Sequence, residues 1–499
     1  MVTRRQIGRL STTGASLLCC AVFFTGCAVT PKYIRPAVPV PTAYRELPAG
    51  ASRDWKPAQP GDLASRGSWW ERFADPELNS LENRLNASNY GIAAAAANVR
   101  AAQAIVQGAR AQYYPTITAA PGISSSRLAT AFGQTIGRTF TSYSFPLDIS
   151  WEPDLWNRIR QTVSANAAAA QASVADLENV RLSAQAELAE DYFQLREQDS
   201  LKELWDSVVT AYQQSVALVR DQSASGLASD EVVAQAEANL HSALAQDANL
   251  AVARAQYEHA IAVLVGEPAS TFKVLEAQWE ADPPPIPAGV PSELLERRPD
   301  VASAERAVAQ ANAQIGIARS AFFPTLLLSA SAGFDGLSIS KWFEWPTRVW
   351  SLGPSFAETL FDAGLRRATV QQFQATYDRT VANYRQTVLT SFQEVEDYLA
   401  ALRTLAGVIE DQDSSIQASR RALEVAEVRY DAGLDPYLNV ISARISLLAA
   451  QQAGVTFRMQ QMVASVQLIK ALGGGWDSSE IPAPQELERR IPRASNERN

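Results

Sequence analysis

The stretch from Asp154 to Ser225 contains neither glycine nor proline, and it constrains the fold more than any other feature. An average globular helix has about 11 to 12 residues, whereas one helix over this window would be about 108 Å long. Its apolar side chains recur in alternating four- and three-residue steps, a heptad-like stripe that packs on a neighbouring helix. Arg181 is the one polar interruption among Val163, Ala167, Ala170, Val174, Leu177, Ala184, Leu188, Tyr192 and Leu195. Alone, this window predicts a coiled coil.

The order of features is repeated along the chain, which changes that interpretation. A second long stripe follows Gly364, and matching landmarks keep offsets of 209, 205, 206 and 207 residues. The pairs are Tyr114-Pro115 with Phe323-Pro324, Trp156-Asn157 with Phe361-Asp362, Glu190–Tyr192 with Glu396–Tyr398, and Gly226-Leu227 with Gly433-Leu434. We therefore predict an internal duplication of helix, β-hairpin, very long helix and helix. Residues 71–280 form the first repeat, and residues 281–477 form the second.

Each repeat has a predicted hairpin, at about 115–151 and about 324–358. From Tyr143 to Trp151, apolar and polar residues alternate, which is typical of a strand with one face of each kind. Pro146 within it is expected at a bulge or an irregular pair. The hairpins with their flanking residues, 113–156 and 322–361, hold 17 of the 42 aromatic residues. A soluble sheet with an aromatic core is one interpretation, and a transmembrane β-barrel with aromatic girdles is the other.

The barrel interpretation requires more than one chain. Four strands cannot close a barrel, and an open sheet edge is not stable in lipid. Three protomers would supply twelve strands, and their long helices would form an α-helical cylinder below them.

The N-terminus is predicted to be a lipoprotein signal peptide, residues 1–26. A basic start and an apolar core precede Phe24-Thr25-Gly26-Cys27, which resembles a bacterial lipobox although Phe24 replaces the usual leucine. Cys27 is then the acylated first residue of the mature chain, and Ala28 after it resembles an outer-membrane sorting signal. Residues 27–70 are expected to form an extended, proline-rich arm, and residues 478–499 a polar, disordered tail.

Charge and composition exclude several classes of function. The net charge of −9 becomes −12 without Arg4, Arg5 and Arg9, which argues against nucleic-acid binding. Beyond the signal peptide, no run of about twenty apolar residues predicts a membrane-spanning helix. His241 and His259 lack metal-ligand spacing, and no nucleotide-binding or hydrolase motif occurs. We predict no enzyme activity, no metal and no cofactor.

Several motifs together resemble a known family. They are the lipobox, Trp69-Trp70, Asp75-Pro76, the run Leu294–Val301 with its Arg-Arg-Pro-Asp, Phe322-Phe323-Pro324 and the ending Leu472-Gly473-Gly474-Gly475-Trp476. With the duplication, they resemble the TolC superfamily of outer-membrane efflux proteins, in its acylated OprM/NodT-type branch. The resemblance implies a mainly α homotrimer, with a 12-stranded outer-membrane β-barrel continued by a periplasmic α-helical barrel. It also implies a periplasmic adaptor protein and an inner-membrane pump of the RND type as partners.

The two helix-to-helix turns lie farthest from the hairpins and therefore form the periplasmic tip. The resemblance implies adaptor docking at Gly226, Leu227, Ser229, Gly433 and Leu434, and a gate formed by Arg220, Asp221, Arg429, Tyr430, Asp431, Asp435 and Leu438. The glycines also suit helix ends, and the charged residues also suit a solvated turn. We expect Asp431 to pair with Arg429 or Arg220. Ser442 stands where relatives often carry an aspartate, so an apolar Leu438 ring is favoured over an acidic one.

The leading functional prediction is passive export of drugs or other small amphiphiles through a tripartite efflux assembly. The same fold serves type I protein secretion, and a structural lipoprotein that conducts nothing is the alternative of a different class. The exported substrates are not encoded in this chain, because selection in such systems happens mainly in the pump.

Overall fold

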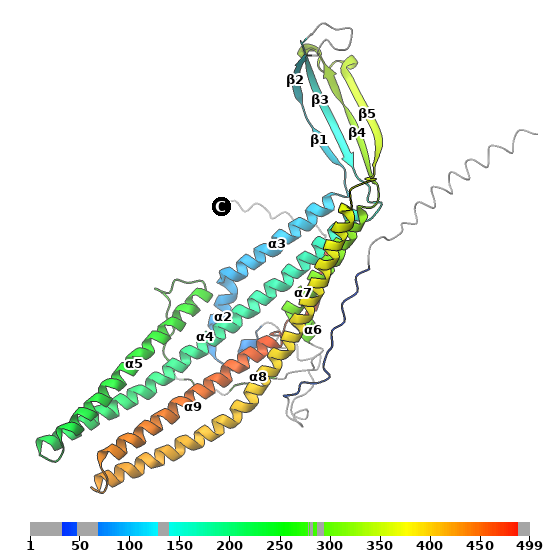
Figure 1. The fold of residues 1–499 in the computed structure, drawn as a ribbon. Coiled ribbons are helices and arrows are strands. Elements are labelled where there is room, and N and C mark those ends of the chain that lie inside the picture. The colour runs from blue at the N-terminus through cyan, green and yellow to red at the C-terminus, as the bar shows by residue number, and fades with distance from the viewer. Residues whose placement is uncertain are drawn as a thin grey trace, which may run out of the picture.

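The chain folds into an elongated molecule with a sheet at one end and paired helices at the other (Figure 1). The computed structural model describes residues 32–46, 68–127, 139–277, 279, 283–286 and 294–487. The predicted signal peptide and Cys27 lie outside these residues, as do residues 128–138 between two strands.

Helices of equal length recur in the two halves of the chain, as the duplication predicts. The upper helices α3 (Tyr90–Ala111) and α7 (Pro299–Ser320) have 22 residues each. The long helices α4 (Arg158–Ala224) and α8 (Leu365–Asp431) have 67 residues each. The returning helices α5 (Asp230–Leu264) and α9 (Tyr437–Ala471) have 35 each. The predicted order of elements is therefore confirmed, and α8 runs through Gly407 without a break.

The five strands form one antiparallel sheet. They are β1 (Thr116–Ala119), β2 (Gly122–Arg127), β3 (Thr139–Trp151), β4 (Thr325–Gly336) and β5 (Arg348–Ala357). Both β1 and β2 pair with β3, which pairs with β4, which pairs with β5. Among the described residues, β5 and the β1/β2 side are therefore open edges.

Pro146 lies beside the interruption between β1 and β2. The registers of β1 and β2 on β3 are continuous, so no residue is inserted as a bulge. On the other side Pro146 faces Gly333, where a Cβ atom would lie 2.1 Å from the Phe145 carbonyl oxygen. The irregular pair is thus accommodated by a glycine in the neighbouring strand.

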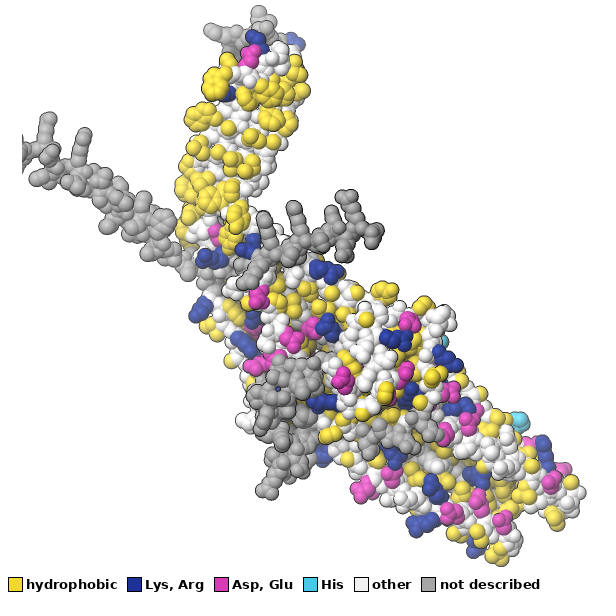
Figure 2. All heavy atoms as spheres, turned by 180° about the vertical axis from the view of Figure 1, so that it is seen from behind, with side chains coloured by type: hydrophobic (Ala, Val, Ile, Leu, Met, Phe, Trp, Pro, Cys, Tyr) yellow, Lys and Arg dark blue, Asp and Glu magenta, His cyan; other side chains and the backbone are white. Residues whose placement is uncertain are grey.

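The sheet has one apolar and one polar face. Side chains directly opposite each other in an antiparallel pair share a face. The apolar face includes the rows Ile117, Ile149, Ala330, Leu352 and Ala119, Leu147, Ala332, Trp350, and the polar face includes Thr118, Asp148, Ser331, Ser351. Figure 2 shows the apolar side chains gathered over the sheet, in contrast to the mixed charges on the helices.

The main core lies at mid-height, where segments distant in the sequence pack on the long helices. The short 3₁₀ helix η3 (Trp69–Phe73) and α2 (Pro76–Ser88) contribute Trp69, Trp70, Phe73, Leu78, Leu81 and Leu85. Asp75 caps α2 by accepting from the backbone N–H groups of Glu77 and Leu78, with Pro76 at the first helical position, as predicted. The short helix α6 (Leu294–Arg297) precedes α7.

The described part of the N-terminal arm, residues 32–46, has no helix or strand and lies on the second repeat. Arg35 donates to the Tyr384 hydroxyl at 3.2 Å, and the Glu396 carboxylate accepts the backbone N–H groups of Arg45 and Glu46. The arm is thus tied to the long helix α8.

The C-terminal segment differs from the expected disordered tail. A 3₁₀ helix, η8 (Ser478–Glu480), and α10 (Pro484–Leu487) pack on the body. The Leu487 side chain is buried against Val106 and Ala170, and Gln171 donates to the Pro482 carbonyl at 2.9 Å. Leu487, an apolar residue in a polar segment, thus packs against α3 and α4 and holds this segment on the body. Residues 488–499 lie outside the described residues.

Among the helices that the structure describes, none combines the length and apolar character needed to cross a bilayer.

Candidate functional site: the helical tips and mid-height joints

Both tips end in the same backbone motif. At the first, the Leu227 N–H bonds the Gln222 carbonyl and the Gly226 N–H bonds the Ser223 carbonyl. At the second, Leu434 bonds Arg429 and Gly433 bonds Tyr430 in the same way. This is the Schellman end of a helix, and its left-handed residue is glycine, with φ of 74° at Gly226 and 70° at Gly433. The helix-ending role of both glycines is therefore established.

The ion pairs at the tips differ from the expected ones. Arg220 pairs with Glu237 at 2.6 Å, and Arg429 pairs with Asp435 at 2.6 Å. Asp431 forms neither expected pair within this chain, because each arginine already bonds a carboxylate of the helix or turn that follows it. Hydrogen bonding to Arg429 lowers the pKa of Asp435 from its usual value. Each ion pair thus links the two sides of one turn within its own repeat.

One side-chain hydrogen bond connects the tips of the two repeats. The Tyr430 hydroxyl donates to the Gln222 side-chain oxygen at 2.9 Å, joining α8 to α4. The Tyr430 ring also packs on Tyr437, with centroids 5.1 Å apart. The sequence analysis placed Tyr430 at the tip but missed Gln222, because the stripe of one helix does not show which residue faces the other repeat.

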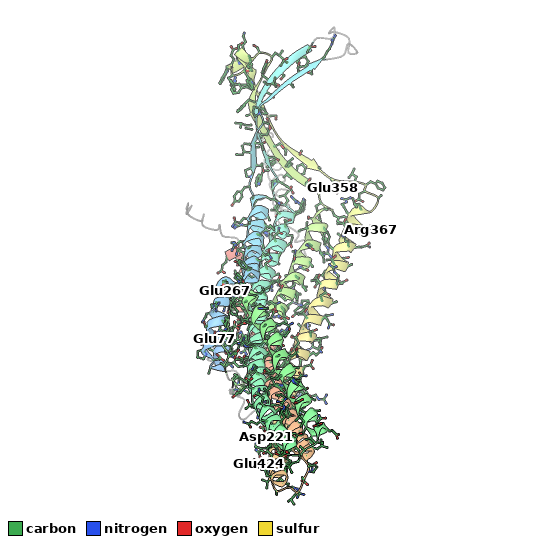
Figure 3. All side chains as sticks on the ribbon, turned by 90° about the vertical axis from the view of Figure 1, so that its left-hand side faces the viewer. Glu77, Asp221, Glu267, Glu358, Arg367 and Glu424 are labelled. Carbon is green, nitrogen blue, oxygen red and sulfur yellow. The ribbon has the colours of Figure 1, made fainter. Side chains whose placement is uncertain are left out.

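Three leucines stand exposed around the tips. Leu227 is 81%, Leu434 67% and Leu438 62% exposed. Asp221 and Ser229 are exposed as well, and Figure 3 shows Asp221 and Glu424 near this end. The Ser442 hydroxyl donates to the Leu438 carbonyl at 2.9 Å, which is a local helical contact.

A joint at mid-height connects the lower helices to the upper ones in each repeat. In the first, the Asn89 side chain donates to the Leu264 carbonyl at 2.7 Å, and the Ser88 hydroxyl donates to the Val265 carbonyl at 2.7 Å. Asn89 also caps α3 by accepting the Ile92 N–H. The residue that begins the upper helix therefore bonds the last residue of the lower one.

The second joint uses a charged residue at the same place. Arg298 precedes α7 and donates to the Ala471 carbonyl at the end of α9, at 3.1 Å. Its guanidinium also bonds Asp300 at 2.7 Å and Glu394 of α8 at 2.6 Å. These two carboxylates raise the pKa of Arg298 above its usual value, against desolvation by burial. The Arg-Arg-Pro-Asp run thus connects three helices, and Glu394 is a partner that sequence reasoning missed.

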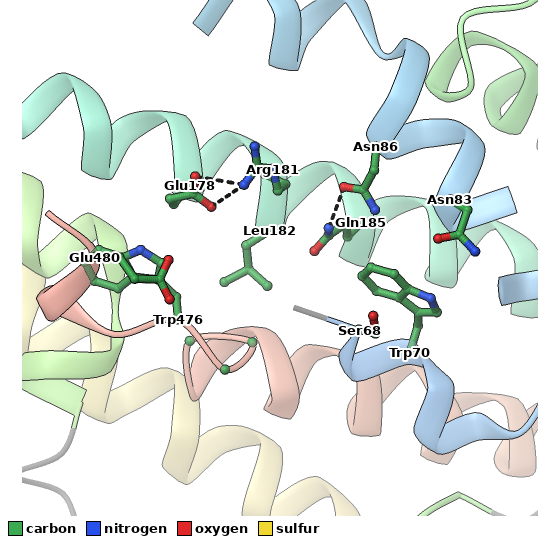
Figure 4. A pocket seen from close by; sticks show the side chains of 13 residues that line it. Ser68, Trp70, Asn83, Asn86, Glu178, Arg181, Leu182, Gln185, Trp476 and Glu480 are labelled. Carbon is green, nitrogen blue, oxygen red and sulfur yellow. Dashed lines mark hydrogen bonds and ion pairs between the residues drawn. The ribbon is translucent and has the colours of Figure 1, made fainter. Parts of the chain in front are cut away.

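The glycine run at the end of α9 allows close packing. A Cβ atom on Gly473 would lie 2.0 Å from the Arg297 carbonyl oxygen, and one on Gly474 would lie 2.3 Å from a Leu182 methyl group. The run borders a cavity of about 540 Å³ that also lies against Trp70, Trp476 and Arg181. Figure 4 shows Leu182 directed at this turn, the Glu178–Arg181 ion pair, and the Gln185–Asn86 hydrogen bond. The run is therefore a packing element as well as a helix stop.

The described residues contain no group of three or more His, Cys, Asp or Glu side chains arranged to hold a metal ion.

Comparisons with known proteins match this duplicated architecture. The profile of a family described as outer membrane efflux protein matches twice, at residues 81–267 and 290–474. The probable efflux pump outer membrane protein TtgC of Pseudomonas putida is 32% identical over 484 residues, covering 96% of this chain and 99% of that protein. The pyoverdine export outer membrane protein OpmQ of Pseudomonas aeruginosa is 32% identical, with coverage of 94% and 98%.

The solved structure of the outer-membrane channel OprN superposes with a TM-score of 0.81 at 28% identity, covering 90% of this chain and 100% of that one. Both repeats, the sheet and the helical tips lie within these matches. The chain belongs to the outer membrane efflux protein family, within the TolC superfamily.

Proposed function

We propose that this protein is the outer-membrane channel of a tripartite efflux system, a passive conduit for drugs or other small amphiphiles. Three copies form the channel. Their sheets close into a 12-stranded barrel in the outer membrane, and their helices form a cylinder in the periplasm.

The observation that carries this proposal is the two-faced sheet with open edges, attached to helices of 67 residues. Exposed apolar side chains such as Trp350 (80%) and Leu352 (77%) suit contact with lipid. The serine-rich opposite face suits a water-filled lumen. Pairing β5 of one chain with the β1/β2 edge of the next removes the open edges, which lipid does not tolerate.

The tips are the proposed docking site for a periplasmic adaptor protein. Leu227 and Leu434 are exposed at equivalent places in the two repeats, directly after the helix-ending glycines. Gly226, Ser229 and Gly433 complete the docking turns. An inner-membrane pump of the RND type is the proposed source of energy, as the resemblance to tripartite efflux proteins implies.

Residues around the docking turns form the proposed gate. Leu438 contributes an apolar ring, and the tip side chains Arg220, Asp221, Arg429, Tyr430, Asp431 and Asp435 surround it.

The proposed lipid anchor at Cys27 acts together with the arm. Residues 32–46 bond α8 through Arg35, Arg45 and Glu46, and Arg403 pairs with Glu46 at 2.6 Å. The arm thereby connects the anchor to the outside of the helical cylinder.

The test is deletion of the gene and measurement of the accumulation of several toxic amphiphiles, with the wild-type gene restored as control. We expect higher accumulation in the deletion strain and recovery on complementation. Unchanged accumulation of every compound would contradict the proposal and favour a structural lipoprotein. A defect limited to one secreted protein would favour type I secretion.

A further inference from the structure

Two exposed arginines occupy equivalent places where the sheet meets the long helices. Arg160 is the third residue of α4, and Arg367 is the third residue of α8. Both are exposed, and no side-chain partner is found for either among the described residues. Figure 3 shows Arg367 close to Glu358, where β5 ends and α8 begins.

The carboxylates nearest in sequence already have partners. Glu152 accepts two hydrogen bonds from Arg158, at 3.0 and 2.8 Å. Asp154 accepts the backbone N–H groups of Ile159 and Arg160, at 3.0 and 2.8 Å.

The same holds at the start of α8. Glu358 and Asp362 both bond Arg366, at 3.1 and 2.7 Å. Among the described residues, neither Arg160 nor Arg367 forms an ion pair with these carboxylates.

The heptad positions of these arginines indicate which way they face. Arg160 precedes Leu188 and Leu195 by four and five heptads, and Arg367 precedes Val388 and Val395 by three and four heptads. Those four apolar side chains lie in the mid-height core, against which Tyr33, Val38 and Val40 of the arm pack. Both arginines thus continue, at heptad spacing, the stripe of positions with which the long helices pack at mid-height.

Exposed apolar side chains lie close to the two arginines in the sequence. Leu360 is 92%, Phe361 87%, Leu365 67% and Leu155 47% exposed. Leu155 lies between β3 and α4, and the other three lie from the end of β5 to the first residue of α8. Exposed apolar residues beside free arginines are typical of the level where acyl chains give way to phosphate groups.

We propose that Arg160 and Arg367 bind the phosphate groups of anionic phospholipids in the periplasm-facing leaflet of the outer membrane. The inference rests on the proposed function, because the barrel must cross that membrane for these residues to reach it. A guanidinium suits this role because it remains charged and forms paired hydrogen bonds with phosphate oxygens. In a trimer the six arginines form a belt that fixes the height of the channel in the bilayer.

The experiment measures lipid selectivity of the full-length protein in phosphatidylcholine vesicles. Spin-labelled phosphatidylglycerol and spin-labelled phosphatidylcholine are compared by the fraction that the protein immobilises. We expect the wild type to prefer phosphatidylglycerol. We expect Arg160→Gln combined with Arg367→Gln to lower that preference by about fivefold for each arginine, and Arg→Lys at both positions to retain most of it.

The matched control is Arg420→Gln with Arg421→Gln, two exposed arginines of α8 far from the sheet, which should leave the preference unchanged. An unchanged preference in the Arg160/Arg367 variant would overturn the proposal. If that variant instead loses its trimer while keeping the preference, the arginines pair with a neighbouring subunit and the proposal is also overturned. Conductance and trimer mass of the wild type, measured on the same samples, test the proposed function separately.

Discussion

The two mid-height joints have the same backbone geometry but different side-chain chemistry. In both, a glycine with positive φ ends the lower helix, Gly266 at 75° and Gly473 at 93°. In both, a backbone carbonyl oxygen lies too close to the glycine for a Cβ atom to fit. The oxygen belongs to Ser88 at Gly266 and to Arg297 at Gly473. The next residue along the chain, Asn89 or Arg298, donates a side-chain hydrogen bond to the carbonyl of the last residue of the lower helix.

The difference is that a neutral amide bridges the first joint and a charged guanidinium bridges the second. Asn89 connects two helices, whereas Arg298 connects α7, α9 and the middle of α8 through Glu394. The comparison teaches that duplication preserved the backbone contact while the bridging side chains diverged, so we expect the two joints to differ in strength. Two pairs of substitutions test this difference, and two further substitutions compare other contacts of the repeats, from the largest expected effect to the smallest.

Adding a methyl group at the joint glycines should have the largest effect. In Gly473→Ala the new Cβ would lie 2.0 Å from a carbonyl oxygen, and in Gly266→Ala 2.6 Å. We expect a loss of at least about 3 kcal/mol at Gly473, since backbone cannot rotate away, and somewhat less at Gly266. Thermal melting of the purified protein measures both.

The matched control is Gly226→Ala, with a similar φ of 74° but no atom within 4 Å. Its stability should fall only by the cost of placing alanine in a left-handed backbone conformation, about 1–2 kcal/mol. Equal losses at Gly226 and Gly473 would show that close approach at the joint is unimportant.

Removing the bridging side chains should show which of the two joints contributes more to stability. Arg298→Ala leaves Asp300 and Glu394 without their partner, and we expect a loss of about 2–3 kcal/mol. Asn89→Ala removes a cap and one bridging bond, for which about 1 kcal/mol is expected. The same melting experiment ranks the two variants, and a larger loss in Asn89→Ala would refute the difference in strength.

Glu190 and Asp191 in the first repeat correspond to Glu396 and Asp397 in the second, and they are expected to make the stability of the fold depend on pH. Desolvation by burial is the main cause that raises the pKa of Glu190 to about 7 and the pKa of Asp191 to about 6. Their counterpart Glu396 instead accepts the backbone N–H groups of the arm. A raised carboxyl pKa means that the folded state binds more protons than the unfolded one, so stability falls as pH rises from about 4 to 7.

Glu190→Gln removes the part of this dependence that comes from Glu190, because the amide does not titrate, whereas Asp191 still does. We therefore expect the variant to lose less thermal stability than the wild type between pH 4.5 and 7.5. Parallel pH profiles for the two proteins would contradict the assignment.

The bond between the tips should have the smallest effect on stability. Tyr430→Phe removes one part-buried hydrogen bond to Gln222, for which about 0.5–1 kcal/mol is expected. Its effect should instead be seen as ion leak in planar bilayers, with Lys202→Ala as the control because that lysine pairs with Asp206 and Asp247 within its own repeat and lies outside the proposed gate. Equal leak in both variants would place the gate elsewhere.

Much of the fold could be predicted from the sequence because long-range periodicity and breakers determine it. The glycine-free window, the alternation from Tyr143 to Trp151 and the Asp75-Pro76 helix start all describe what the structure contains. Each is a local pattern repeated at a fixed offset, so the duplication could be detected without knowing any contact.

Contacts between segments could not be predicted in this way. The stripe does not show that Arg429 turns to Asp435 or that Tyr430 reaches Gln222, since both depend on how two helices are placed side by side. The order of residues 478–487 was also missed, because Leu487 gains its stability only from the site that α3 and α4 provide. Polar composition alone predicted disorder there.

The most direct test of the account is the conductance of the purified full-length protein in planar lipid bilayers. We predict discrete channels of small conductance for the wild type, and a larger conductance when Tyr430→Phe is combined with Leu438→Ala to loosen the tip. An inserted trimer that conducts no ions in either form would contradict the claim that this chain is a conduit.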